Sequence, residues 1–166
     1  MASSAWVWIE NKKDALKNII GKVDVMLTND AEARQFFGTP NLIKAGRAFL
    51  DMGPKAVIIK KGEHGAILFT GDQCFVAPAY PLENLVDPTG AGDSFAGGVL
   101  GWLARTGRRD TGTIRQSLVC GAVMSSIAIE GFSPESLAGV GPGEIRNRVT
   151  ALHRLVEFQL ADDLPV

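Results

Sequence analysis

Two hydrophobic periods alternate along the first part of the chain, one typical of helices and one typical of buried strands. Apolar residues spaced three and four apart predict a helix over 12–20 and another that begins at Asn41 and ends at Gly53-Pro54. Short, mostly apolar runs follow each helix and predict strands at 23–27 and 56–60. Runs of this kind are expected in a parallel sheet that is covered on both faces.

The middle of the chain changes to strands joined by short turns. The apolar run 66–70 is separated from the run 73–78 by Gly71-Asp72. Turns this short predict hairpins at one side of the sheet. The helical period then returns at 94–104, 113–129 and 145–156.

Composition bounds the class of protein. The 166 residues suit a single domain over 1–166, and 46% hydrophobic with 21% charged residues is ordinary for a globular chain. A net charge of −1 gives no electrostatic footprint for nucleic acid, and no apolar run approaches the roughly 20 residues of a membrane span. Cys74 and Cys120 have no metal-ligand spacing, so we expect two buried thiols in a reducing compartment and a cytoplasmic protein. Residues 1–10 contain neither a basic leader nor a sustained apolar segment, so we expect no secretory signal peptide.

The chemistry of the chain centres on the stretch Asp87-Pro88-Thr89-Gly90-Ala91-Gly92-Asp93. Glycines at 90 and 92 allow unusual backbone angles and close approach of a ligand. Successive N–H groups that lead into a helix N-terminus make a concave anion site, and Asp93 would be a carboxylate beside the bound anion. The alternative is that Asp93 is an ordinary helix N-cap after a glycine-rich turn.

A second candidate lies where the strand 23–27 gives way to a helix that runs through Glu32 to Phe37. Asn29 and Glu32 are three apart, which is the spacing of a capping box. The same two side chains also stand at the end of a strand, where open α/β sheets place their ligands. The two interpretations are compatible.

A third candidate is the turn after the strand 56–60. Lys60-Lys61-Gly62-Glu63-His64-Gly65 is explained simply as an exposed β-turn with glycines for the turn geometry. On this interpretation His64 is a turn residue rather than a base or a ligand.

The stretch 87–93, followed by Gly97-Gly98-Val99-Leu100, resembles the second signature of the PfkB (ribokinase-like) carbohydrate kinases. The order of elements over roughly residues 6–160 is similar to the C-terminal, nucleotide-binding half of such a kinase. The resemblance implies a three-layer α/β/α, Rossmann-like sandwich around a mainly parallel sheet, truncated at its N-terminal side. It also implies ATP-dependent phosphorylation of a sugar or related small-molecule hydroxyl.

The resemblance also assigns roles to residues. Asp93 would be the catalytic base, and the amides of Gly90, Ala91 and Gly92 would form the anion hole. The other assignments are Asn29 and Glu32 holding Mg²⁺ through water near the ATP phosphates, Gly62 and Gly65 lining the nucleotide site, Lys60 or Lys61 contacting phosphate, and Asp87 with Thr89 near a monovalent cation such as K⁺.

The resemblance leaves out the sugar-binding half and the β lid of these kinases. The alternative function is therefore a non-catalytic nucleotide-binding or association fragment. Half a parallel sheet leaves a strand edge and apolar helix faces uncovered, which predicts self-association. A dinucleotide-binding Rossmann enzyme is a weaker competitor, because no Gly-x-Gly-x-x-Gly follows the first strand.

Overall fold

The computed structural model describes residues 1–71, 73–132 and 135–159. Within them the strands form one sheet in the order β1-β2-β3-β4-β5. β1 pairs in parallel with β2 and β2 with β3, whereas β4 is antiparallel to both β3 and β5. Four of these five strands therefore run in one direction. Their bounds are β1 Ala2–Ser3, β2 Val25–Asn29, β3 Ala56–Lys60, β4 Ala66–Thr70 and β5 Gln73–Ala77.

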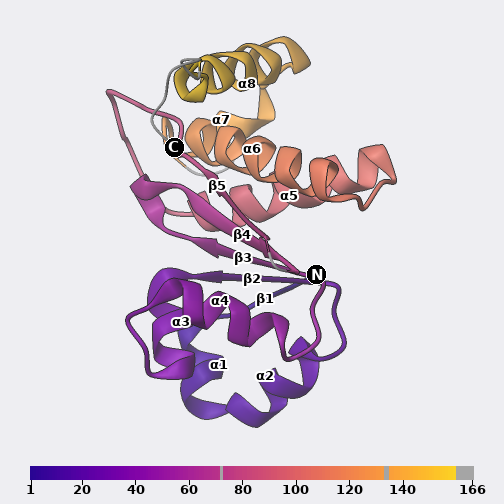
Figure 1. The fold of residues 1–166 in the computed structure, drawn as a ribbon. Helices are drawn as coiled ribbons and strands as arrows, with labels where there is room; N and C mark the ends of the chain where they lie inside the picture. The colour runs from indigo at the N-terminus through magenta and orange to yellow at the C-terminus, as the bar shows by residue number, and fades with distance from the viewer. Residues whose placement is uncertain (72, 133–134, 160–166) are drawn as a thin grey trace.

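Helices cover both faces of the sheet, as Figure 1 shows. Helices α1 to α4 lie on one face and α5 to α8 on the other, which confirms the three-layer α/β/α prediction. The first group comprises α1 Trp6–Asn11, α2 Lys13–Ile20, α3 Asp30–Phe37 and α4 Leu42–Leu50. The second comprises α5 Ala91–Thr106, α6 Thr111–Ala128, α7 Glu135–Ala138 and α8 Pro142–Val156, and a short 3₁₀ helix, η1 Gly62–His64, follows β3.

The alternation of side chains along β3 divides the core in two. Val57 and Ile59 belong to the cluster beneath α1 to α4, and Ala56 and Ile58 belong to the cluster beneath α5, α6 and α8. Successive side chains of a strand point to opposite faces, so both faces of β3 must be apolar. The same alternation directs Lys60, two residues after Ile58, toward the layer that contains α5.

Helices α5 and α6 pack closely through small residues. A Cβ atom on Gly98 would lie 2.8 Å from Cys120 O and 2.8 Å from Gly121 Cα. A Cβ atom on Gly121 would lie 2.9 Å from Phe95 O. Tight helix packing therefore accounts for these glycines without any ligand.

The sequence expectations hold for most elements and fail at identifiable places. Strand β2 begins at Val25 rather than at residue 23, and the bond from Ala56 N to Asp24 O starts its pairing with β3. Helix α5 begins at Ala91 rather than Ser94. Strand β1 and helix α1 are not predicted, since two and six residues are too short to show a period.

The expectation of two buried thiols is wrong for Cys74. It lies on β5, which is the edge strand of the described sheet, and its side chain is exposed. Cys120 on α6 is half-buried, and burial raises the pKa of its thiol. Neither cysteine forms a disulfide. Among the described helices none is long and apolar enough to cross a membrane.

Candidate functional site

The stretch 87–93 forms a turn that opens α5. Gly90 is the N-cap residue and has φ of 79°, a left-handed conformation in which a side chain is strained. Asp93 lies in the first turn of the helix and caps nothing, so the N-cap interpretation of Asp93 is wrong. Its carboxylate is exposed and has no hydrogen bond or ion pair with the residues that the structure describes.

Main-chain hydrogen bonds fix the approach to this turn. Val86 N donates to Ile129 O at 2.8 Å, which ties the segment to the end of α6. Thr89 N donates to Asp87 Oδ1 at 2.9 Å, and the bonds from Thr89 hold the pKa of the Asp87 carboxyl below its usual value. Asp87 thus orders the turn from within.

The first turn of α5 presents unused N–H groups. Ala91 N donates to Pro88 O at 3.2 Å, while the amides of Gly92 and Asp93 have no acceptor in the described part of the chain. Such orphan donors, together with the helix dipole, carry partial positive charge. An anion is the natural partner for this helix end.

The Lys60 side chain lies against the same helix end. A Cβ atom on Gly92 would be 2.6 Å from Lys60 Nζ, so the ammonium occupies the space that a side chain at 92 would need. Gly92 itself has an ordinary helical backbone, and its lack of a side chain is what lets the lysine approach.

No described residue accepts a hydrogen bond from, or forms an ion pair with, the Lys60 ammonium. A cation beside the positive end of a helix is unfavourable unless an anion joins the two. Lys61 follows at the N-cap of η1, outside β3, where its main-chain N donates to Gly65 O at 2.7 Å. The structure therefore separates two lysines that the sequence left equivalent.

Asn29 is brought to the same edge of the sheet by strand register. Asn29 and Lys60 are Cα partners at the carboxyl ends of the parallel strands β2 and β3. Asn29 Oδ1 accepts from Glu32 N at 2.8 Å, and Glu32 Oε2 accepts from Asn29 N at 3.2 Å. This is the capping box that the spacing predicts.

Two further hydroxyl groups, which sequence reasoning missed, contact the Glu32 carboxylate. Ser4 Oγ donates to Glu32 Oε2 at 2.7 Å, and Thr28 Oγ1 donates to the same oxygen at 3.1 Å. No spacing marks Ser4, because it meets Glu32 only through the pairing of β1 with β2.

The turn after β3 has the glycine geometry that the sequence suggests. Gly62 and Gly65 both have positive φ, 56° and 78°. Gly65 also lies against the next segment, where a Cβ would be 2.1 Å from Ala77 O. His64 lies on the exposed side of η1, with its Nε2 3.7 Å from Glu63 Oε1, as expected of a turn residue.

The described residues contain no group of three or more His, Cys, Asp or Glu side chains that could hold a metal. A magnesium ion needs fewer protein ligands than such a group supplies, and the oxygens of Asn29 and Glu32 at this edge fit it. Mg²⁺ prefers oxygen ligands and keeps several waters. Glu32 Oε1 makes no hydrogen bond to a described residue, and Asn29 Oδ1 retains a second lone pair beside its bond to Glu32 N.

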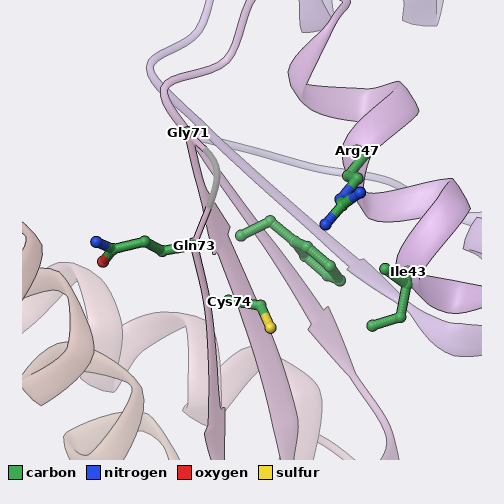
Figure 2. A pocket seen from close by; sticks show the side chains of 6 residues that line it. Ile43, Arg47, Gly71, Gln73 and Cys74 are labelled. Atoms are coloured by element: carbon green, nitrogen blue, oxygen red, sulfur yellow. The ribbon is translucent and has the colours of Figure 1, made fainter.

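A small hollow elsewhere in the molecule is unrelated to this edge. It is lined by Ile43 and Arg47 of α4 and by Gln73 and Cys74 of β5, beside the Gly71 turn (Figure 2). Lys60 pairs with Ala66 and the β4–β5 turn follows Thr70, so the hollow lies at the opposite end of the strands.

The fold is that of the ribokinase-like kinases. Aminoimidazole riboside kinase from Salmonella enterica, solved with aminoimidazole riboside and an ATP analogue, superposes with a TM-score of 0.73 and 25% identity over 83% of this chain. A nucleoside kinase from Methanocaldococcus jannaschii has a TM-score of 0.71 over 90% of this chain at 20% identity, which shows the shared fold.

The sequence comparisons then identify the family. The model of the pfkB family carbohydrate kinases matches residues 2–137, and the chain belongs to this family. Cytidine kinase of Thermococcus kodakarensis is 36% identical over 57% of this chain. ATP-dependent 6-phosphofructokinase of Thermoanaerobacterium thermosaccharolyticum is 30% identical over 75% of it.

The chain spans only part of the length of these relatives. It covers 34% of the cytidine kinase and 37% of the phosphofructokinase. It covers 46% of the aminoimidazole riboside kinase structure.

Proposed function

We propose that this chain carries the phosphoryl-transfer site of a kinase that moves the γ-phosphate of ATP to a hydroxyl group of a sugar or nucleoside. The observation that carries the proposal is the Lys60 ammonium beside Gly92, at the positive end of α5, without an acceptor among the described residues. Two positive groups that converge without an ion pair to a described carboxylate favour a phosphate as the ligand.

The proposed mechanism relies on positioning and charge, as phosphoryl transfer generally does. The exposed Asp93 carboxylate takes the proton of the substrate hydroxyl as that oxygen attacks. The amides of the Gly90-Ala91-Gly92 turn and the Lys60 ammonium stabilise charge on the transferred group. Asn29 and Glu32 would hold a magnesium ion through water, and the ion would neutralise phosphate charge when bound.

The remaining assignments complete the nucleotide site. Gly62 and Gly65 would shape the turn that lines it. Thr89 and Asp87 order the turn 87–93 and would provide oxygens for a monovalent cation such as K⁺. The named relatives act on nucleosides and sugars, which supports this substrate class. We place the reaction in the cytoplasm, consistent with two unpaired cysteines.

Asp93→Asn tests the base assignment. The substitution keeps the size of the side chain and removes the base, so ATP turnover with sugars and nucleosides should fall by about 10²–10⁴-fold. Affinity for a non-hydrolysable ATP analogue should stay within about threefold, because Asp93 makes no contact that the fold needs. Turnover that survives Asp93→Asn would refute the assignment.

A second candidate function is a nucleotide-binding or association fragment without turnover. It is favoured by the share of the relatives that the chain spans, 34% and 37%. An apolar hollow of about 290 Å³, lined by residues that include Trp8, Leu16 and Ile19, lies beside the β1 edge. Trp6 and Trp8 are more than half exposed, at 58% and 53%.

An uncovered strand edge beside exposed tryptophans favours self-association through this side. Light scattering over a concentration series should give a mass above one chain, and Trp8→Lys should lower it. A mass of one chain at every concentration contradicts the association. Binding of magnesium–ATP without turnover on any sugar or nucleoside would support this second function over the kinase.

A further inference from the structure

We infer that Ser4 is a positioning residue for Glu32 in the magnesium–nucleotide site, an inference that rests on the proposed function. Its hydroxyl donates to Glu32 Oε2 at 2.7 Å and lies 2.7 Å from Thr28 Oγ1. Ser4 lies outside the stretch 87–93 and the Asn29–Glu32 pair, so nothing in those motifs assigns it a role.

Within the described residues, every hydrogen bond to the Glu32 carboxylate is made to one of its two oxygens. Oε2 receives the hydroxyls of Ser4 and Thr28, the latter at 3.1 Å, and the amide of Asn29 at 3.2 Å. Glu32 is only 8% exposed, and a buried carboxylate is costly without such donors. Oε1 has no hydrogen bond within the described ranges and is left as the oxygen available to a cation-bound water.

Ser4 is itself fixed by the sheet. Its main-chain N donates to Leu27 O at 3.0 Å, directly after the pairing of Ser3 with Leu27. The hydroxyl is therefore delivered to Glu32 by the β1 edge, and the orientation of the carboxylate depends on that edge. Donors that orient a metal-holding group typically change metal affinity by 10–100-fold when removed.

The test is a magnesium titration of Ser4→Ala at a fixed concentration of a non-hydrolysable ATP analogue. We expect the affinity for magnesium to fall about 10–100-fold, with the affinity for the analogue in EDTA unchanged. Ser4→Thr should restore the magnesium affinity because it keeps the hydroxyl. Ser3→Ala is the matched control, since the Ser3 hydroxyl is exposed and its one hydrogen bond to a described residue is the 3.5 Å contact with Ser4 O.

The outcomes separate this inference from the function on which it rests. Unchanged magnesium affinity in Ser4→Ala, or an equal loss of analogue affinity in EDTA, overturns the positioning role and leaves the kinase proposal standing. A wild-type chain whose nucleotide binding ignores magnesium overturns both. If Ser4→Ala fails to fold, Thr28→Val removes another donor from the same oxygen and carries the same expectation.

Discussion

Replacing Gly92 with alanine should weaken nucleotide binding while leaving the fold at least as stable. The added methyl group would lie 2.6 Å from Lys60 Nζ. Non-bonded atoms of this size prefer about 3.5–4.0 Å, so the ammonium must withdraw by about 1 Å. The flexible lysine can move, and the cost should therefore appear in binding rather than in folding.

The magnitude follows from the bond that is lost. A hydrogen bond to a charged group contributes about 1.5–3 kcal/mol, which corresponds to a roughly 10–100-fold weaker Kd for the ATP analogue. In the opposite direction, alanine is a better helix former than glycine by about 1 kcal/mol. Binding and stability should therefore change with opposite signs in Gly92→Ala.

The assay is calorimetric titration of the analogue, paired with chemical denaturation. Gly97→Ala, on the same helix, is the matched control, because a Cβ atom at that position would meet nothing within 4 Å. Lys60→Met should weaken binding to a similar extent, and combining it with Gly92→Ala should add little. If Gly92→Ala binds the analogue like the wild type, Lys60 does not hold the phosphate as we propose.

Three further predictions concern stability. Gly98→Ala should lower the free energy of unfolding by about 1–3 kcal/mol, because its methyl would lie 2.8 Å from the backbone of α6, whereas Gly101→Ala, with nothing within 4 Å, should leave it unchanged or raise it. The side chain of Arg148 is 15% exposed and binds residues of α6 and α8. Changing Arg148 to methionine should therefore lower the free energy of unfolding, measured by urea denaturation, by about 1–3 kcal/mol. The same change at the exposed Arg146 should cost little, and equal losses would contradict this. Asp110 caps α6, and its hydrogen bonds lower the pKa of the carboxyl from 3.8 to about 2. The loss of unfolding free energy in Asp110→Ala should therefore be largest above pH 4 and should shrink as pH falls from 4 to 2. A loss independent of pH would refute the role of the charge.

The sequence is enough to predict the order and type of the main elements because their periods are long and clear. The strands at 56–60 and 66–70 are found at those residues, and the α5 and α6 predictions err only at their ends. Helix α1 and strand β1 are too short to carry a period.

Part of the candidate site can likewise be predicted from the sequence, and part of it cannot. Local geometry, such as the capping box at Asn29 and the positive φ of Gly90, follows from residue type and spacing. The choice of Lys60 over Lys61 could have been drawn from the alternation of β3, since Lys60 shares a face with Ile58. The contact of Ser4 with Glu32 could not, because it depends on how β1 pairs.

The order of the strands across the sheet has a consequence for how the chain folds. Every described strand pairs with its neighbours in sequence, β1 with β2 through to β4 with β5. The connections between partners are local in the sequence, and the entropy of closing a loop grows only slowly with its length, so we expect the sheet to grow in the direction of synthesis. Helix α5, whose first turn lies against Lys60, comes after the last of these strands. The site should therefore assemble only on a sheet that is already formed.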